Sequence, residues 1–239
     1  RNTGLEYATS DLIAFLDDDD TLTPNSIEDR ARFLEENSAI DVVYGEISIT
    51  DLTENARVLF GAKTGIPAPS GNVFAAFAER NRRPVHAFMF RRSVIERVGI
   101  FDTTLSCLED YDFWLRVSAK SQFQYMPQVV GNYRFHGAQM TSLRRRMAET
   151  EITVRERILE TPAFTSLTPI QQSRVFVIQG TQYAQLGEIT VARHWYQRAR
   201  HTAPNYFLPK LLMPLTLFGR RGIAVSLLFF RLLRRSYSH

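Results

Sequence analysis

Four consecutive aspartates, Asp17–Asp20, follow an apolar stretch in the segment FLDDDDTL. No lysine or arginine stands close to them in the sequence, so the run concentrates negative charge. A solvated acidic turn is one interpretation. The alternative is a cation site: if the backbone stays extended past Leu16, the carboxylates of Asp17 and Asp19 point the same way, about 7 Å apart. Such oxygen ligands suit Mg²⁺ or Mn²⁺ better than zinc.

A second acidic group lies at the start of a predicted helix, in the segment LEDYDFWLR (108–116). It contains Glu109, Asp110 and Asp112. Acids in a first turn favour the helix dipole, and Ser106 with Glu109 fits a capping box, so one alternative is a purely structural role. The other is catalysis, in which one carboxylate takes a proton as a general base.

The segment Tyr133-Arg134-Phe135-His136 is the third candidate group. Arg134 and His136 alternate along a predicted strand and would face the same side, where they could hold phosphate oxygens. A single histidine is more often structural than catalytic, so the pattern alone leaves the role of His136 open.

The elements around these groups indicate an α/β fold. Residues 11–16 predict an inner strand, and ligands in open α/β sheets bind outside the carboxyl ends of strands, where Asp17–Asp20 fall. Thr23 and Pro24 predict the N-cap and first turn of a helix over 24–36. The other predicted elements are a strand at 40–45 that continues into 46–51, a loop at 61–72, a helix at 72–82, a strand at 87–90, a helical turn at 91–98, a helix at 108–119 and a strand at 122–135.

From residue 144 onward only helices are predicted, at 145–160 and 169–203. One stretch has the spacing of a tetratricopeptide repeat, carried by Gly180, Tyr183, Leu186, Gly187, Ala192, Tyr196, Ala199 and Pro204. Its small residues would let two helices approach, with the tyrosines between them. An ordinary helical hairpin is the alternative. The predicted parts are therefore a domain at 1–142, a helical region at 143–205 and a tail at 206–239.

The tail contains six basic and no acidic side chains. Its apolar stretches, 211–219 and 222–230, are too short to span a bilayer, which takes about 20 residues. Pro209 and Pro214 are expected to break the first stretch as a helix, whereas 222–235 can form one. The tail is either core of the helical region or a segment that lies on a membrane surface.

The amino-acid composition limits the classes of protein to which this chain can belong. The 239 residues are 44% hydrophobic, which suffices for a sizeable core and excludes a disordered or collagen-like chain. A single cysteine, Cys107, rules out an internal disulfide and favours a reducing, cytoplasmic compartment. Residues 1–60 contain 14 acidic and 4 basic side chains, unlike the basic tail. No secretory leader is expected, and nucleic acid is not an expected partner.

The ordered set of motifs resembles the family 2 glycosyltransferases of the GT-A fold over residues 1–142. The residues that carry the resemblance are Asn2-Thr3-Gly4 with Ala8, the strand into Asp17–Asp20, Pro24, Gly99-Ile100-Phe101-Asp102, Glu109 to Arg116 and Tyr133 to His136. The implied fold is α/β, a partial Rossmann-like GT-A nucleotide-sugar transferase domain followed by an all-α C-terminal region.

The resemblance also implies roles for single residues. Asp19 would be the main ligand of a divalent cation, Mg²⁺ or Mn²⁺, with Asp17 also contributing, and Asp110 would be the catalytic base. The residues implied to contact the nucleotide sugar are Asn2, Gly4, Asp17, Asp18, Arg134 and His136. Those on the acceptor side are Glu109 and Asp112. Transfer to a hydroxyl group would invert the anomeric configuration.

Family members begin with a strand, a Pro-Thr-x-Asn-like turn and an Asp-rich motif that binds base and ribose, and none of these stands ahead of Arg1. We therefore expect a piece that starts in mid-domain, with the activity belonging to the full-length parent and little nucleotide binding by the piece alone.

The expected function is metal-dependent sugar transfer from a nucleotide-sugar donor to a saccharide or lipid-linked acceptor. It would serve synthesis of a surface polysaccharide or glycoconjugate, in the cytoplasm or peripherally at the inner face of the plasma membrane. The alternative is a non-catalytic scaffold with a degenerate transferase domain and a helical interaction tail. A metal-dependent phosphohydrolase is a third, weaker hypothesis, because a nearby lysine and an Asp-x-Asp-x-Thr/Val nucleophile motif are missing.

Overall fold

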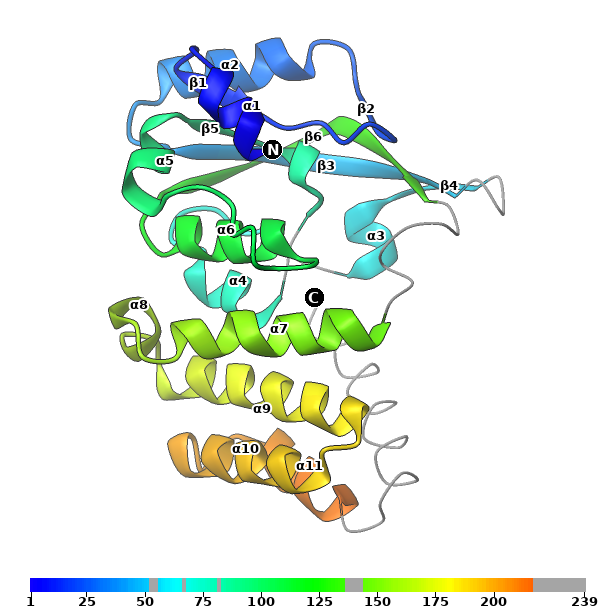
Figure 1. Ribbon diagram of the computed structural model, residues 1–239, viewed down its shortest axis with the longest axis vertical. Helices are drawn as coiled ribbons and strands as arrows, with labels where there is room; N and C mark the ends of the chain where they lie inside the picture. The colour runs from blue at the N-terminus through cyan, green and yellow to red at the C-terminus, as the bar shows by residue number, and fades with distance from the viewer. Residues whose placement is uncertain (52–55, 66–67, 81–82, 136–143, 217–239) are drawn as a thin grey trace. The chain divides into compact units, whose positions relative to one another are not determined.

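The computed structural model describes residues 1–51, 56–65, 68–80, 83–135 and 144–216 (Figure 1). The chain divides into two compact units. The first contains Arg1–Leu105 and Glu109–Ser142, and the second contains Ser106–Leu108 and Leu143–His239. An α/β unit is thus followed by a helical one, which confirms the predicted fold class.

A mixed sheet forms the centre of the first unit. Its strands are β1 (Leu12–Ala14), β2 (Thr21–Leu22), β3 (Val42–Asp51), β4 (Ala56–Leu59), β5 (Phe88–Arg91) and β6 (Phe123–Phe135). Within the described residues the order is β1-β5-β3-β6-β2, and β4 pairs with β3. The pair β3–β6 is parallel, whereas the other pairs are antiparallel.

Helices cover both faces of this sheet. They are α1 (Asn2–Tyr7), α2 (Ser26–Glu36), α3 (Phe60–Thr64), α4 (Phe74–Glu79), the short η1 (Val85–Ala87), α5 (Ser93–Val98) and α6 (Glu109–Ser118). In Figure 1, α2 lies on one side of the sheet, and α4 and α6 lie on the other.

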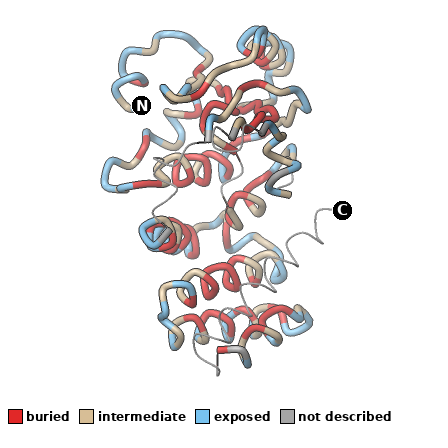
Figure 2. Tube along the Cα trace, turned by 90° about the vertical axis from the view of Figure 1, so that its right-hand side faces the viewer, coloured by how far each residue is buried: buried red, intermediate tan, exposed pale blue. Residues whose placement is uncertain are grey.

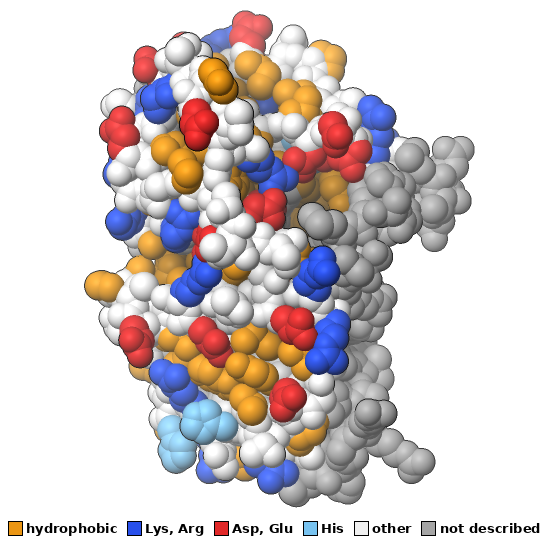
Figure 3. Space-filling model, viewed as in Figure 1, with side chains coloured by type: hydrophobic (Ala, Val, Ile, Leu, Met, Phe, Trp, Pro, Cys, Tyr) orange, Lys and Arg blue, Asp and Glu red, His pale blue; other side chains and the backbone are white. Residues whose placement is uncertain are grey.

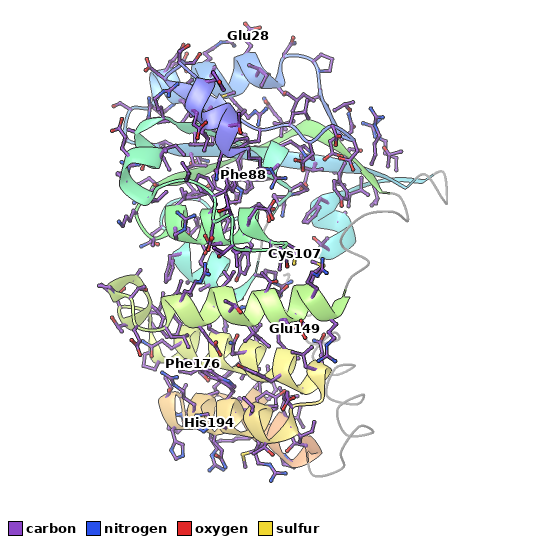
Figure 4. All side chains as sticks on the ribbon, viewed as in Figure 1. Glu28, Phe88, Cys107, Glu149, Phe176 and His194 are labelled. Atoms are coloured by element: carbon purple, nitrogen blue, oxygen red, sulfur yellow. The ribbon has the colours of Figure 1, made fainter. Side chains whose placement is uncertain are left out.

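Successive side chains of β5 point to opposite faces of the sheet, so this strand packs against the helices on both sides. Met89 packs with Leu34 of α2, whereas its neighbour Phe88 points to the opposite face (Figure 4) and stacks on Trp114 of α6, with 4.1 Å between ring centroids. Strands β3 and β5 are buried along nearly their whole length (red in Figure 2), as expected for strands between two helical layers.

A bulge interrupts the β3–β6 pairing on both sides of Glu46. The Glu46 Oε1 atom accepts hydrogen bonds from the backbone N–H groups of Ile47, at 2.9 Å, and Gly61, at 3.2 Å. Its Oε2 atom lies 3.4 Å from Nη2 of buried Arg83. The buried carboxylate is therefore paired and hydrogen-bonded, as the low polarity of the interior requires.

Several details differ from the sequence predictions. The first strand ends at Ala14 instead of continuing to Leu16, and α2 starts at Ser26 with Asn25 as its N-cap, in the left-handed region at φ 65°. Thr23 is therefore not the cap, and its hydroxyl instead donates to the carbonyl of Val129 at 2.6 Å. The segment 61–72, predicted as a loop, begins inside α3.

The second unit contains α7 (Arg144–Ile158), α8 (Pro162–Thr165), α9 (Pro169–Leu186), α10 (Ile189–Thr202) and α11 (Phe207–Leu215). A capping box formed by Thr168 and Gln171 starts α9, and Gly187, at φ 89°, ends it. α9 packs against α7 and α10, and α10 packs against α11. Phe176 of α9 (Figure 4) meets Trp195 of α10 with 5.7 Å between centroids.

The hairpin α9–α10 depends on close approach at Gly180. A Cβ atom there would lie 2.7 Å from the ring of Tyr196 and 3.0 Å from the carbonyl oxygen of Ala192. Tyr196 is buried between the helices, whereas the Tyr183 hydroxyl donates to Glu156 of α7 at 2.8 Å. A tetratricopeptide-like unit and an ordinary hairpin both predict this pair of helices, so the repeat assignment stays a prediction.

The two prolines of α11 do not break it, contrary to the sequence prediction. Pro209 stands in the first turn, where backbone N–H groups have no intrahelical partner, and Pro214 stands in the last turn. Leu208 and Leu212 are buried, so this part of the tail is core. No helix among the described residues is long and apolar enough to cross a membrane. The helix predicted at 222–235 lies outside the described residues.

Candidate active site

Asp17–Asp20 form a turn instead of an extended segment. The backbone N–H of Asp20 donates to the carbonyl oxygen of Asp17 at 3.1 Å, which closes the turn over Asp18 and Asp19. The predicted alternation, with Asp17 and Asp19 on one side of a strand, is therefore wrong. Asp18 is exposed, Asp17 and Asp19 are half-buried and Asp20 is buried, so the four carboxylates have different surroundings.

Arg1 joins the aspartate turn to the start of α6. Its Nη2 atom lies 2.7 Å from Oδ1 of Asp17, and its Nη1 atom pairs with Oε1 of Glu109. Burial, the largest single influence, disfavours the charge of Arg1, but the hydrogen bond and charge of Asp17, with the charges of Asp110 and Glu109, outweigh it and raise the pKa of the guanidinium. A basic partner for the aspartates thus exists, although the local sequence showed none.

Asp20, at the other end of the run, also has a basic partner. Oδ2 of Asp20 lies 3.0 Å from Nδ1 of His86, and both side chains are fully buried. Oδ1 of Asp20 accepts a hydrogen bond from the backbone N–H of Arg134 at 3.0 Å. Asp20 therefore connects the turn to β6 from inside the protein.

Asp110 and Asp112 of α6 differ in their partners. Oδ1 of Asp110 accepts from the N–H of Tyr111 at 2.7 Å, so Asp110 caps one of the free donors of the first turn. Asp112 is buried and lies 2.9 Å from Nε of Arg116. Because α6 begins at Glu109, Ser106 is too far back to cap it, and the predicted capping box with Glu109 is wrong.

The pKa of Tyr133 indicates that the aspartate turn and α6 lie close together. Its pKa is raised to about 12, chiefly by burial. The remaining causes are the negative charges of Asp20, Asp19, Asp17 and Asp110. Carboxylates more than 90 positions apart in the sequence therefore act on one phenol, and the two acidic groups form one site.

The other predicted nucleotide contacts are placed as follows. The side-chain amide of Asn2 donates to the carbonyl of Phe101 at 2.9 Å and accepts from its N–H at 3.0 Å, which ties α1 to the segment before α6. A side chain at Gly4 would meet open space. Arg134 is exposed near the end of β6, and His136 lies outside the described residues. Their roles toward a nucleotide stay predictions.

Sequence reasoning missed three members of the site: Arg1, His86 and Tyr133 as a neighbour of the turn. Arg1 directly precedes the Asn2-Thr3-Gly4 motif, which is a local signal of its place. His86 lies between apolar residues in the segment PVHAFMF and gives no such signal.

The donor set around the turn fits a cation that is shared with a substrate. No cluster of three or more His, Cys, Asp or Glu side chains in the described part of the chain could hold a metal by itself. Mg²⁺ typically binds one or two carboxylates together with waters and substrate phosphates, so a complete protein cage is not required. Asp19, on the apex of the turn, and Asp17, beside Arg1, are such carboxylates.

Comparison with known proteins agrees with this geometry. Residues 1–99 match the family described as Glycosyl transferase family 2. Over 145 residues the chain is 30% identical to an uncharacterized glycosyltransferase, YwdF, of Bacillus subtilis, covering 58% of this chain and 50% of that protein. A Methanocaldococcus jannaschii glycosyltransferase, MJ1057, is 28% identical over 138 residues, covering 56% and 45%.

A Haemophilus influenzae relative, also an uncharacterized glycosyltransferase, is 29% identical over 149 residues, which is 59% of this chain and 46% of that protein. The chain thus spans about half the length of these three relatives. The matched region contains α1, the aspartate turn and the sheet strands β1 to β5. The first 99 residues, which make up most of the α/β unit, are therefore similar to glycosyl transferase family 2.

Proposed function

We propose that the protein transfers a sugar from a nucleotide-sugar donor to a hydroxyl group of an acceptor, with a divalent cation and with inversion of the anomeric centre. The observation that supports it best is the meeting of the aspartate turn and the α6 carboxylates in one site, joined through Arg1. Donor phosphates need a cation and an acceptor hydroxyl needs a base, and this site has carboxylates for both.

Asp19 and Asp17 would hold Mg²⁺ or Mn²⁺ against the donor diphosphate. When bound, the cation offsets negative charge on the departing nucleotide diphosphate. The Asp17–Arg1 pair gives Asp17 a second role, since the guanidinium sets the direction of its carboxylate. Asn2, Gly4, Asp18, Arg134 and His136 are the further residues assigned to the donor.

Asp110 would take the proton of the acceptor hydroxyl. Oδ1 of Asp110 is fixed by the Tyr111 N–H, which orients the carboxylate at the start of α6. As the O–H proton moves to Asp110, the acceptor oxygen forms a bond to the anomeric carbon, and the bond from that carbon to the diphosphate breaks. Attack from the side opposite the leaving group inverts the configuration. Glu109 and Asp112 flank Asp110 on the acceptor side.

Chelation of the metal tests the proposal in the full-length parent. EDTA should abolish sugar transfer, and added Mn²⁺ or Mg²⁺ should restore it. Asp19→Ala should remove most activity with little change in thermal stability, because removing one of several like charges relieves repulsion. NMR of the product's anomeric proton reports inversion. Full activity in EDTA would contradict the metal role, and a retained configuration would contradict direct displacement.

The acceptor we propose is a saccharide or a lipid-linked precursor of a surface polysaccharide or glycoconjugate, reached at the inner face of the plasma membrane. Basic charge supports this location. Residues 189–216 contain no acidic side chain, and His194, Arg198, His201 and Lys210 are exposed (histidines pale blue in Figure 3). A basic residue near anionic lipid contributes about 1 kcal/mol.

Vesicle co-sedimentation tests this membrane role. The full-length parent should pellet with phosphatidylserine-containing vesicles in low salt and be released in high salt, and deletion of residues 217–239 should weaken pelleting. Equal pelleting with and without this segment would assign any lipid contact to another part of the chain.

A further inference from the structure

His86 is a fully buried histidine to which the proposed reaction assigns no role. It lies in η1, directly before β5, and its Nδ1 atom is 3.0 Å from Oδ2 of Asp20. Both side chains have no exposed surface. The contact has the distance of an ion pair but not the alignment of a hydrogen bond, and Oδ2 of Asp20 has no hydrogen-bond partner among the described residues. A buried carboxylate needs basic or hydrogen-bonding groups, and the imidazole is the group that meets Oδ2.

Asp20 extends this link to two other parts of the site. Its Oδ1 atom accepts the backbone N–H of Arg134 in β6 at 3.0 Å, and its own N–H donates to Asp17 at 3.1 Å. The first contact fixes Asp20 to the sheet, and the second closes the turn that contains Asp19. A displacement of the Asp20 side chain would therefore move the turn relative to β6.

Strand β6 accommodates the imidazole ring of His86. A Cβ atom on Gly131 of β6 would lie 2.7 Å from Cδ2 of His86, so only glycine fits beside the ring. Tyr133, two residues further on the same face of β6, lies nearly parallel to the imidazole, at 13° with 6.4 Å between centroids. The carbonyl of His86 accepts from Nη1 of buried Arg30 at 3.1 Å.

We propose that His86 is a positioning residue: through Asp20 it fixes the aspartate turn to β6 and so sets the place of Asp19. Arg1 holds one end of the run and His86 holds the other, which leaves Asp18 and Asp19 at the apex between two anchored carboxylates. The claim that His86 anchors Asp20 concerns the protein alone. The claim that this anchoring favours cation binding rests on the proposed function.

Amide hydrogen exchange of Arg134, measured by NMR on the whole chain without metal or donor, tests the anchoring. His86→Leu removes both ring nitrogens, and the Arg134 amide should then exchange about tenfold faster or more, since its acceptor is no longer held. His86→Asn keeps a donor near the position of Nδ1 and should return exchange to within about threefold of the native rate. His86→Phe, which keeps an aromatic ring beside Tyr133, takes the place of leucine if that variant does not fold.

The matched control is Glu46→Gln, which weakens a different buried ion pair of this sheet, the one with Arg83. It should leave Arg134 exchange unchanged relative to amides in the rest of β6. Unchanged exchange in His86→Leu, or equal acceleration in Glu46→Gln, overturns the anchoring.

Electron paramagnetic resonance of Mn²⁺ with inorganic pyrophosphate tests the positioning. His86→Leu should weaken Mn²⁺ binding about tenfold, His86→Asn should restore most of it, and Glu46→Gln should leave it unchanged. Faster Arg134 exchange with native Mn²⁺ affinity overturns the positioning role. If the native chain binds no Mn²⁺, the proposed metal site is wrong, and the anchoring by His86 is then decided by the exchange rates alone.

Discussion

Asp110 and Asp112 stand two residues apart on α6, yet their partners give them different tasks. Oδ1 of Asp110 accepts one backbone N–H, whereas Asp112 is buried against Arg116, whose other nitrogens donate to the carbonyls of Val98 and Ile100. Asp112 therefore holds α6 to the segment that precedes it, and Asp110 is the better candidate for proton transfer.

Replacing each aspartate by asparagine separates the two tasks. Asp110→Asn should lower kcat about 10²–10⁴-fold, because the amide cannot take the acceptor's proton, with little loss of stability, because it still accepts the Tyr111 N–H. Asp112→Asn should lower the free energy of unfolding by about 1–3 kcal/mol and affect kcat less. Steady-state kinetics and urea unfolding measure both. Near-normal turnover in Asp110→Asn with a large loss in Asp112→Asn would reverse the assignment.

The sequence indicated the acidic residues of the candidate site, but it did not show how their charge is balanced. Asp17 and Asp20 have partners 16 positions before and 66 positions after them, in Arg1 and His86. Local sequence cannot show such pairs, because they depend on how η1 and α1 are placed by the sheet. The turn geometry was missed for a similar reason: Asp20 leaves the strand direction to reach His86 and β6.

At the scale of elements, long segments with a clear pattern were predicted well and short ones were not. β3, β6 and α6 follow the predicted ranges closely, since each has a sustained apolar pattern, whereas the helical stretch predicted at 169–203 is divided into α9 and α10. β2 and β4 consist of two and four residues, and they exist only through pairing with β6 and β3. Such strands are produced by tertiary contacts, which local propensity does not contain.

The α9–α10 hairpin offers a test of close helix packing. Gly180→Ala places a methyl group 2.7 Å from the ring of buried Tyr196 and 3.0 Å from a backbone carbonyl. Alanine favours a helix over glycine by about 1 kcal/mol, but overpacking typically costs about 1–3 kcal/mol. We expect a net loss of stability in the second unit, measured by urea unfolding with the fluorescence of Trp195.

Gly4→Ala is the matched control for Gly180→Ala, because Gly4 also lies inside a helix and its added methyl group would meet open space. It should leave stability unchanged or raise it slightly, through helix propensity alone. If Gly180→Ala also stabilises the chain, α9 and α10 can separate at no cost, and the close contact does not define the hairpin.

At the scale of the whole molecule, each unit contains a tyrosine whose ionisation opposes folding: half-buried Tyr133 in the first and buried Tyr196 in the second. The pKa of Tyr133 in the first unit and that of Tyr196 in the second are both raised to about 12, mainly by burial. In the unfolded chain a tyrosine ionises near pH 10, as in model peptides. Between about pH 10 and pH 12 the unfolded state therefore binds fewer protons than the folded state, and stability falls as the pH rises.

Fluorescence can follow this alkaline loss in each unit separately, because the two tryptophans lie in different units, Trp114 in the first and Trp195 in the second. Urea unfolding at several pH values, followed in Trp114→Phe, reports the second unit. Its free energy of unfolding should drop between pH 10 and pH 12, and Tyr196 should account for about 2–3 kcal/mol of the drop. Tyr196→Phe should remove that part of the pH dependence, at the cost of the 3.2 Å contact with Thr181.

Tyr133→Phe is the matched control, because it changes the first unit and should leave the alkaline profile of the second unchanged. The same experiment in Trp195→Phe, with Trp114 as the reporter, should give the opposite result: Tyr133→Phe flattens the profile and Tyr196→Phe does not. Equal slopes in native and Tyr196→Phe chains would contradict the argument, since burial of the phenol would then not be what resists ionisation.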